Sequence, residues 1–308
     1  MLPTLKPEEP GKKMINCSIG IMAYNEEANI GRLLNALLRQ NLSHCFIKEI
    51  FVVASGCTDK TEDIVKDYIR VDERIKLLSQ KQREGKASAI NLFLSKANAD
   101  VFVLESGDTI PEVNTIEKLV MPFSDPTIGM TGGHPVPVNP QDTCIGFIVN
   151  LMWKVHHRIA LEHPKMGELV AFRNIVKEIP RDTAVDEASI EAIVLHDGYM
   201  LKYVEDALVH NKGPENIRDF LKQRRRIAAG HLYVRQKQAH TVSTTSGTHI
   251  LGPFLRELKG GGKEYLWGGC AVLLEIIGRT LGYYDYYVKK RNPFIWDIAE
   301  STKKLRGD

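Results

Sequence analysis

The sequence has few cysteines, and their spacing argues against the common cysteine-based scaffolds. Five cysteines stand far apart, at Cys17, Cys45, Cys57, Cys144 and Cys270. No Cys-x-x-Cys pair occurs, so neither a zinc ribbon nor a disulfide framework is indicated. A reducing cytosol is the simplest compartment for such a chain.

Long apolar runs are missing as well. No stretch reaches the ~18 uninterrupted apolar residues expected of a membrane-spanning helix, and Glu275 and Arg279 interrupt the apolar run near the end. The polar start MLPTLKPEEPGKK lacks the apolar core of a signal peptide. A net charge of +3 is too small to indicate a nucleic-acid partner. These absences predict a cytoplasmic protein, either soluble or in contact with the cytosolic face of a membrane.

The composition and periodicity indicate an α/β protein. Apolar residues make up 43% of the chain and charged residues 26%, which is ordinary for a globular protein. Short apolar runs at 17–22, 49–54, 75–79 and 101–104 predict strands. Helical patterns at 27–40, from residue 58 or 59, and from residue 85 separate them. This alternation predicts βαβ units and a parallel sheet.

The second half of the sequence is less regular. It predicts strands at 128–133 and 168–172, an extended segment at 199–211, and helices at 145–159, 186–198 and 214–230. Thr, Ser and Gly dominate from residue 240 to 263. We therefore expect four regions: a flexible segment at 1–14, a catalytic domain at 15–235, a loop or linker at 236–263, and an amphipathic helical region at 264–308.

Polar side chains follow three of the expected strands. Ala23, Tyr24, Asn25 and Glu26 follow the first strand, Ser55 begins the loop after the second, and Glu105 and Asp108 follow the fourth. Ligands of open α/β sheets bind beyond the carboxyl ends of the strands, so these loops predict one site. No GxGxxG follows the first strand, which argues against a dinucleotide cofactor. A turn at Ser106–Thr109 and a helix start capped by Asn25 are alternative interpretations.

Six segments in order resemble the inverting family 2 glycosyltransferases, which have the type A nucleotide-diphospho-sugar transferase fold. The resemblance spans about residues 15–230. Its segments are IGIMAYNEEANIGRLLNALLRQ, EIFVVASGCTDKTEDIV, REGKASAIN, VLESGDTIP, AVDEASIEAIV and QRRRI. It implies a mainly parallel central sheet flanked by helices, with a C-terminal helical appendage, and a sugar-transfer activity in which hexosyl transfer is expected.

The resemblance implies a donor site for a nucleotide-diphospho-sugar. Ala23, Tyr24 and Glu26 would line the nucleoside, and Ser55 stands where the family often has a base-pairing acid. Arg83 and Lys86 would contact the diphosphate or ribose. Gln223 and Arg226 match the Gln-x-x-Arg-Trp motif, in which Ile227 replaces the Trp.

A divalent cation, Mg²⁺ or Mn²⁺, is the expected cofactor, because negative charge develops on the departing diphosphate. Such cations often take one or two protein carboxylates plus phosphate oxygens. Asp108 fits the last acid of the family's Asp-x-Asp motif, and Ser106 stands where the motif has its first. Glu105 and His210 are the further candidate ligands.

Inverting transfer also needs a carboxylate that takes the proton of the acceptor hydroxyl. The resemblance places this base in the pair Asp186–Glu187 and favours Glu187, although acids also favour a helix start. We expect transfer from a UDP- or GDP-sugar to a glycan or lipid-linked acceptor, at a hydroxyl or a lipid phosphate. A non-catalytic nucleotide- or glycan-binding protein and a sugar-phosphate nucleotidyltransferase are the alternatives.

The C-terminal region is rich in aromatic and apolar residues from Tyr265 to Tyr287, and Lys289, Lys290 and Arg291 follow. Aromatic rings beside cations are typical of a segment at a membrane interface. This pattern predicts peripheral membrane contact. A helix with its aromatic residues in the core of the catalytic domain is the alternative.

Overall fold

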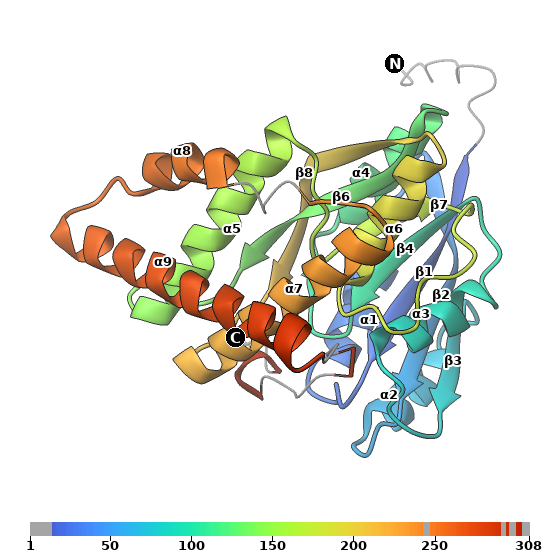
Figure 1. Cartoon of the computed structure of the whole chain (residues 1–308). Helices are drawn as coiled ribbons and strands as arrows, with labels where there is room; N and C mark the ends of the chain where they lie inside the picture. The colour runs from blue at the N-terminus through green and yellow to red at the C-terminus, as the bar shows by residue number, and fades with distance from the viewer. Residues whose placement is uncertain (1–13, 243–246, 291–293, 296–299, 304–308) are drawn as a thin grey trace, which may run out of the picture.

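The computed structural model of the chain describes residues 14–242, 247–290, 294–295 and 300–303 (Figure 1). The segment expected at 1–14 lies outside these residues except for Met14, and so does Arg291 of the expected basic patch.

An eight-stranded sheet lies at the centre, in the order β3-β2-β1-β4-β7-β6-β8-β5. The pairs β3–β2, β2–β1, β1–β4 and β6–β8 are parallel, while β7 runs antiparallel to β4 and β6, and β5 antiparallel to β8. The strands are β1 (Ile15–Ala23), β2 (Cys45–Ser55), β3 (Ile75–Gln80), β4 (Val101–Ser106), β5 (Ile110–Pro111), β6 (Ile128–Pro137), β7 (Val170–Arg173) and β8 (Met200–Asn211). The expected mainly parallel sheet is confirmed.

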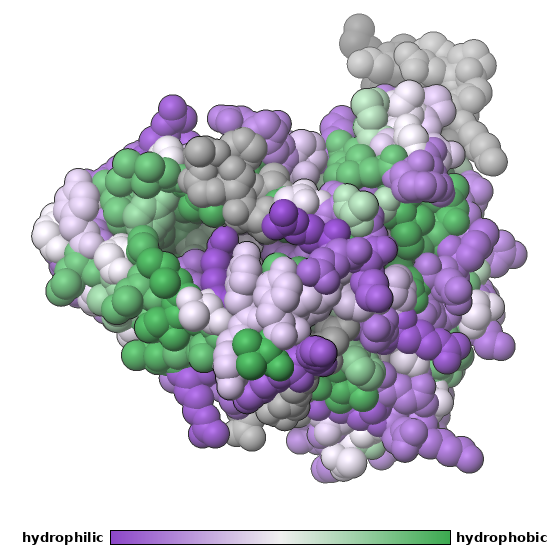
Figure 2. Space-filling view, in the orientation of Figure 1, coloured by the Kyte–Doolittle hydropathy of each residue, from purple (hydrophilic) through white to green (hydrophobic). Residues whose placement is uncertain are grey.

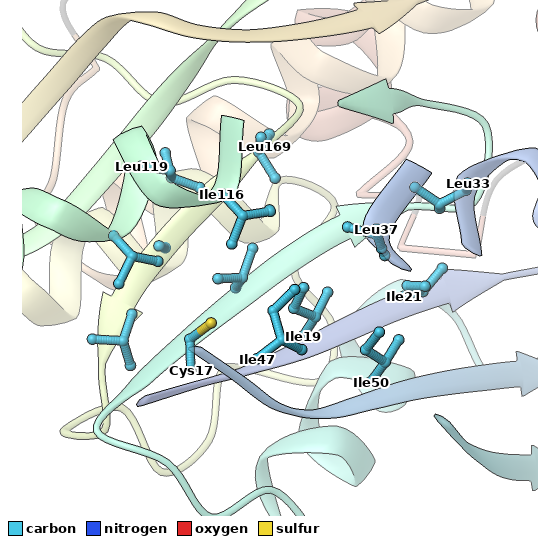
Figure 3. Packing of buried hydrophobic residues seen from close by; sticks show 14 of the residues in the cluster. Cys17, Ile19, Ile21, Leu33, Leu37, Ile47, Ile50, Ile116, Leu119 and Leu169 are labelled. Carbon is cyan, nitrogen blue, oxygen red and sulfur yellow. The ribbon is translucent and has the colours of Figure 1, made fainter. Parts of the chain in front are cut away.

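Helices cover both faces of the sheet, because alternate side chains of each strand point to opposite faces. On one face α1 (Ile30–Leu38), α2 (Thr61–Ile69) and α4 (Thr115–Val120) bury an aliphatic cluster that includes Ile19, Ile21 and Ile50 (Figure 3). On the other face α3 (Lys86–Leu94) and α6 (Asp186–His196) cover the second cluster, in which Phe93 contacts Phe51 and Phe102 edge to face. These two cores hold the carboxyl ends of β1, β2 and β4 in fixed positions.

Four further helices gather to one side of the sheet, at the left and centre of Figure 1. They are α5 (Cys144–Glu162), α7 (Ile217–Lys237), α8 (Gly247–Glu257) and α9 (Gly262–Tyr283), which a π-helical turn extends over Tyr284–Val288. α9 packs against α7 and α5, and α8 packs against α5. Among the described residues, no helix is long and apolar enough to cross a membrane.

Three local expectations are wrong. The helix predicted to end at Gly230 continues to Lys237, because Gly230 packs against Val185 in the middle of α7. The loop expected at 236–263 contains α8, whose apolar residues Ile250 and Phe254 pack against the α5 cluster. Asn25 does not cap α1, which begins after Asn29.

Candidate functional site

A cavity of about 850 Å³ lies where the carboxyl ends of β1, β2 and β4 meet α5, α7, α8 and α9. Most of the residues singled out in the sequence line this one cavity. The loops after β1, β2 and β4 and the segments that follow them contribute Ala23, Tyr24, Glu26, Ser55, Arg83, Lys86, Ser106 and Asp108. Helices α6 and α7 contribute Asp186, Glu187, Gln223 and Arg226. The predicted convergence of these loops is therefore confirmed in space.

Tyr24 and Arg83 form a flat surface at one end of the cavity. The guanidinium carbon of Arg83 lies 4.4 Å from the centre of the Tyr24 ring. Beside it, Asn25 adopts a left-handed backbone conformation with φ of 53°, and its Oδ1 accepts a hydrogen bond of 2.8 Å from the backbone N–H of Thr58. This hydrogen bond connects the loops after β1 and β2 and helps to hold Tyr24 at the end of the sheet.

Glu26 lies deep in the same end of the cavity, with 4% of its surface exposed. Its Oε2 accepts a hydrogen bond of 2.9 Å from Asn29, and its Oε1 forms an ion pair with Lys303. Lys303 Nζ also donates to the backbone oxygen of Tyr24 at 2.8 Å. Burial and the nearby Asp108 raise the pKa of Glu26 to about 7, and Lys303 opposes this rise. Residues 279 positions apart therefore build this wall together.

The paired acids at the start of α6 are held by a lysine from α3. Lys86 Nζ lies 3.0 Å from Asp186 Oδ2 and 3.3 Å from Glu187 Oε1. Burial and the Asp186 charge raise the pKa of Glu187 above its ordinary value, against the effect of Lys86. Burial alone would lower the pKa of Lys86, but Asp186 and Glu187 raise it. The lysine therefore stays charged and fixes both carboxylates at the cavity wall.

The residues predicted as metal ligands separate in the structure. Asp108 lines the cavity, whereas Glu105 has 1% of its surface exposed and contacts Thr109 beneath the loop. His210 Nε2 lies 3.2 Å from Glu112 and is absent from the cavity wall. Within the described part of the chain, no three His, Cys, Asp or Glu side chains gather as a metal-binding group.

Glu168 and Lys165 also line the cavity, and neither was predicted. Burial and the charges of Asp108 and Glu187 raise the pKa of Glu168 to about 7. Because β7 runs antiparallel to β4, the segment before β7 meets the carboxyl end of β4. The sequence predicted the β7 strand but not its direction, so it gave no signal that an acid at the start of that strand would reach the site.

Residues 18–146 match the sequence model of "Glycosyl transferase family 2". This part of the chain is therefore similar to that family. The chain is also similar to the "Probable glycosyltransferase YdaM" of Bacillus subtilis, with 26% identity over 249 residues, covering 74% of this chain and 58% of the relative. It is also similar to an "N-acetylglucosaminyltransferase" of Bradyrhizobium diazoefficiens, with 22% identity over 287 residues, covering 85% and 53%. The chain thus spans about half the length of these two relatives.

Solved structures share the fold of this chain. A mannosyltransferase from Pyrobaculum calidifontis in complex with GDP-Man and Mn²⁺ aligns with a TM-score of 0.64 and 17% identity, covering 91% of each chain. Glucosyl-3-phosphoglycerate synthase from Mycobacterium tuberculosis, in complex with Mn²⁺, UDP and glucosyl-3-phosphoglycerate, aligns with a TM-score of 0.52 and 16% identity, covering 74% and 82%. The expected type A glycosyltransferase fold is confirmed.

Proposed function

We propose that this chain is an inverting glycosyltransferase that moves a sugar from a UDP- or GDP-sugar to an acceptor, with hexosyl transfer expected. One observation carries the proposal: Lys86 holds the Asp186–Glu187 pair in the same cavity as the loops after β1, β2 and β4. The match of residues 18–146 to family 2 and the similar fold of the nucleotide-bound structures support it.

The donor nucleotide would occupy the end of the cavity formed by Tyr24, Glu26, Ser55 and Arg83. The surface of Tyr24 and Arg83 is suited to a flat base, and a carboxylate such as that of Glu26 accepts hydrogen bonds from ribose hydroxyls. Ser106 lies beside this end, while Gln223 and Arg226 approach the cavity from α7. Burial lowers the pKa of Arg226, while the charges of Glu187, Asp186 and Glu168 oppose this. Its guanidinium would contact the donor diphosphate.

A divalent cation, Mg²⁺ or Mn²⁺, fits this site if it arrives with the donor. Asp108 is the carboxylate at the cavity wall that would hold it, and its charge raises the pKa of both Glu26 and Glu168. A bound cation relieves such repulsion, and one carboxylate plus phosphate oxygens is a usual shell for Mg²⁺. It would stabilise the negative charge on the departing diphosphate. Ligand roles for Glu105 and His210 remain predictions.

Glu187 would act as the base toward an acceptor hydroxyl. Its carboxylate takes the hydroxyl proton while the acceptor oxygen attacks the anomeric carbon from the face opposite the diphosphate, which leaves with the bonding electron pair. Lys86 positions the carboxylate, and the raised pKa of Glu187 brings its proton affinity closer to neutral pH, where a base is most effective.

The test is the release of nucleoside diphosphate from a panel of UDP- and GDP-sugars, with Mn²⁺ or with a chelator. Thermal shifts would first identify the donor that binds.

We expect Glu187→Gln to lower kcat by about 10²- to 10⁴-fold without weakening donor binding, and the exposed Glu162→Gln to match the wild type. Full activity of Glu187→Gln with an inactive Asp186→Asn would move the base to Asp186. No turnover and no donor binding across the panel would reject the function.

We also propose that α8 and α9 rest on a membrane surface. α9 packs partly through small residues, since Gly278 lies against Arg224 and Gly282 against Ala228, while several of its large side chains are exposed. Exposed large residues on α8, α9 and the following turn include Leu251, Leu255, Leu266, Leu273, Tyr283, Tyr284 and Tyr287. Figure 2 shows hydrophobic residues gathered over these helices. The exposed tyrosines disagree with the alternative in which all the aromatic residues lie in the core. A lipid-linked acceptor would enter the cavity from this side of the molecule.

A further inference from the structure

Two cysteines that stand far apart in the sequence meet where α9 packs against α5. Cys144 is the first residue of α5, and Cys270 lies in the first half of α9. Both side chains pack against the apolar cluster that α5, α8 and α9 share. Phe147 and Trp267 each lie one helical turn from a cysteine, and the centres of their rings are 5.5 Å apart. The packing of these two helices therefore brings both thiols to the same place.

The two thiols are in contact with each other. Burial and the neighbouring Cys270, which shares a hydrogen bond with Cys144, raise the pKa of the Cys144 thiol. Neither cysteine forms a disulfide within the described part of the chain, and both side chains are partly exposed. A small reagent can therefore reach this pair. Contact between two thiols and access for a reagent are the conditions under which a disulfide forms.

The first half of α9 can adjust to such a bond. Three glycines at 260–262 stand at its junction with α8, and Gly268 and Gly269 directly precede Cys270. Glycine inside a helix weakens it, because the backbone has more freedom to lose. No described atom lies within 4 Å of the Cβ position of Gly269, so this side of the helix has space. A small movement of α9 can therefore bring the sulfur atoms to bonding geometry without disturbing the sheet.

We propose that Cys144 and Cys270 form a reversible disulfide when the protein meets a low-molecular-weight disulfide such as oxidised glutathione. One of the two thiolates attacks a sulfur of the reagent, and the first glutathione leaves as a thiolate. The other cysteine then attacks the protein-bound sulfur, and the second glutathione leaves. The two cysteines thus lose two protons and two electrons, and the reagent is reduced to two thiols. A disulfide of this transient kind is the usual one in a reducing compartment.

The bond would fix one wall of the cavity. Ala271 and Val272 directly follow Cys270 and line the cavity, and Val149 and Met152 line it from α5. The bond also closes a long loop of the chain, and such a disulfide stabilises a protein by restricting its unfolded state. Oxidation therefore holds α9 against α5 and raises the melting temperature.

Peptide mapping of the full chain tests the bond. The reduced protein is incubated with oxidised glutathione, free thiols are blocked with N-ethylmaleimide, and the digest is analysed without reduction. We expect a peptide pair that joins Cys144 to Cys270 within one chain. Cys17 and Cys45 are the matched control, because they also share a hydrogen bond but are fully buried, and they should stay reduced. Equal oxidation of both pairs, a lasting glutathione adduct on Cys144 or Cys270, a bond between two chains, or no reaction would overturn the proposal.

Thermal unfolding of variants tests the effect of the bond. The oxidised wild type should melt at least about 4 °C above the reduced protein. Cys144→Ser and Cys270→Ser should each lose this shift, whereas Cys57→Ser, in the loop after β2, should keep it. The same shift in Cys270→Ser, or no shift in the wild type, would contradict the proposed effect. Neither measurement uses a nucleotide-sugar, so a failure here leaves the proposed function standing, and a lack of turnover leaves the disulfide standing.

Discussion

At the scale of single residues, Glu105 shows how burial sets the charge of a side chain. It lies at the end of β4 with one carboxylate oxygen bound to Thr109 and the other, Oε2, buried without a hydrogen-bond partner among the described residues. Burial and the charges of Glu168 and Asp108 raise its pKa to about 8. The residue is therefore protonated in the folded protein at neutral pH, although it would be ionised in the unfolded chain.

We predict that this difference makes the protein less stable at alkaline pH. Below pH 4.5 Glu105 is protonated in both states. Between pH 4.5 and 8 the unfolded chain releases the proton first, so the free energy of unfolding falls by up to about 1.4 kcal/mol per pH unit. Glu105→Gln should remove this slope and be more stable than the wild type at pH 8. Urea unfolding at pH 5 and pH 8 measures it, with the exposed Glu162→Gln as control. Parallel slopes for Glu105→Gln and the wild type would contradict the assignment.

Some of the site residues could be predicted from the sequence, because the order of strands and helices along the chain determines where they lie. Tyr24, Ser55 and Asp108 follow strands of a parallel sheet, so their meeting at one edge is a consequence of βαβ connections. The contact of Lys86 with Glu187 joins residues 101 positions apart and depends on how α3 and α6 pack on the sheet. No local pattern contains that information, and the same holds for Lys165 and Lys303.

At the scale of elements, the crossing of α7 over the segment before α6 depends on one glycine. A Cβ at Gly230 would lie 2.8 Å from Val185 Cγ1 and 3.3 Å from Ala184 Cβ. Val185 directly precedes the paired acids. The close approach of α7 thus helps to fix the start of α6.

We predict that Gly230→Ala destabilises the protein by about 1–3 kcal/mol, the usual cost of overpacking, and also lowers turnover by shifting Asp186 and Glu187. Gly269→Ala in α9 is the matched control, because nothing lies within 4 Å of its Cβ position. There alanine should stabilise the helix by up to about 1 kcal/mol. Thermal unfolding of both variants measures the contrast. A stabilised Gly230→Ala would show that α7 can move away from Val185 without loss.

Helices and strands were predicted well where the hydrophobic periodicity and the residues that end an element indicate the same boundaries, as in the first four strands. Gly230 misled the prediction because glycine commonly ends helices, yet here it is needed for close packing inside one. The composition of residues 240–263 suggested a loop, but Ile250 and Phe254 gain enough burial against α5 to support a short helix. Both differences arise from tertiary packing, which a local pattern does not contain.

At the scale of the whole molecule, the exposed apolar residues of α8 and α9 lie on one side of the domain (Figure 2). Leu266 and Leu273 are 67% and 57% exposed on α9. Lys289 lies near them in sequence, with its ammonium 5.4 Å from the centre of the Tyr284 ring. Apolar and aromatic side chains beside cations suit the headgroup region of an anionic bilayer.

We predict that the full chain sediments with anionic vesicles and less with neutral ones, and that added salt weakens the binding, since each surface cation contributes about 1 kcal/mol. Leu266→Glu together with Leu273→Glu should abolish the binding. Val71→Glu, at a residue 79% exposed beyond α2, should leave it unchanged. If wild-type protein stays in the supernatant with both kinds of vesicle, the membrane proposal is wrong.

The pairing of Lys303 with Glu26 also has a consequence for biosynthesis. The two residues are 277 positions apart, and Ser301 donates to Asp219 at 2.7 Å on the way. At translation rates of about 5–20 residues per second, the last part of this wall leaves the ribosome roughly 14 to 55 s after the first. During that interval the nascent chain already contains the acid but lacks the lysine that pairs with it.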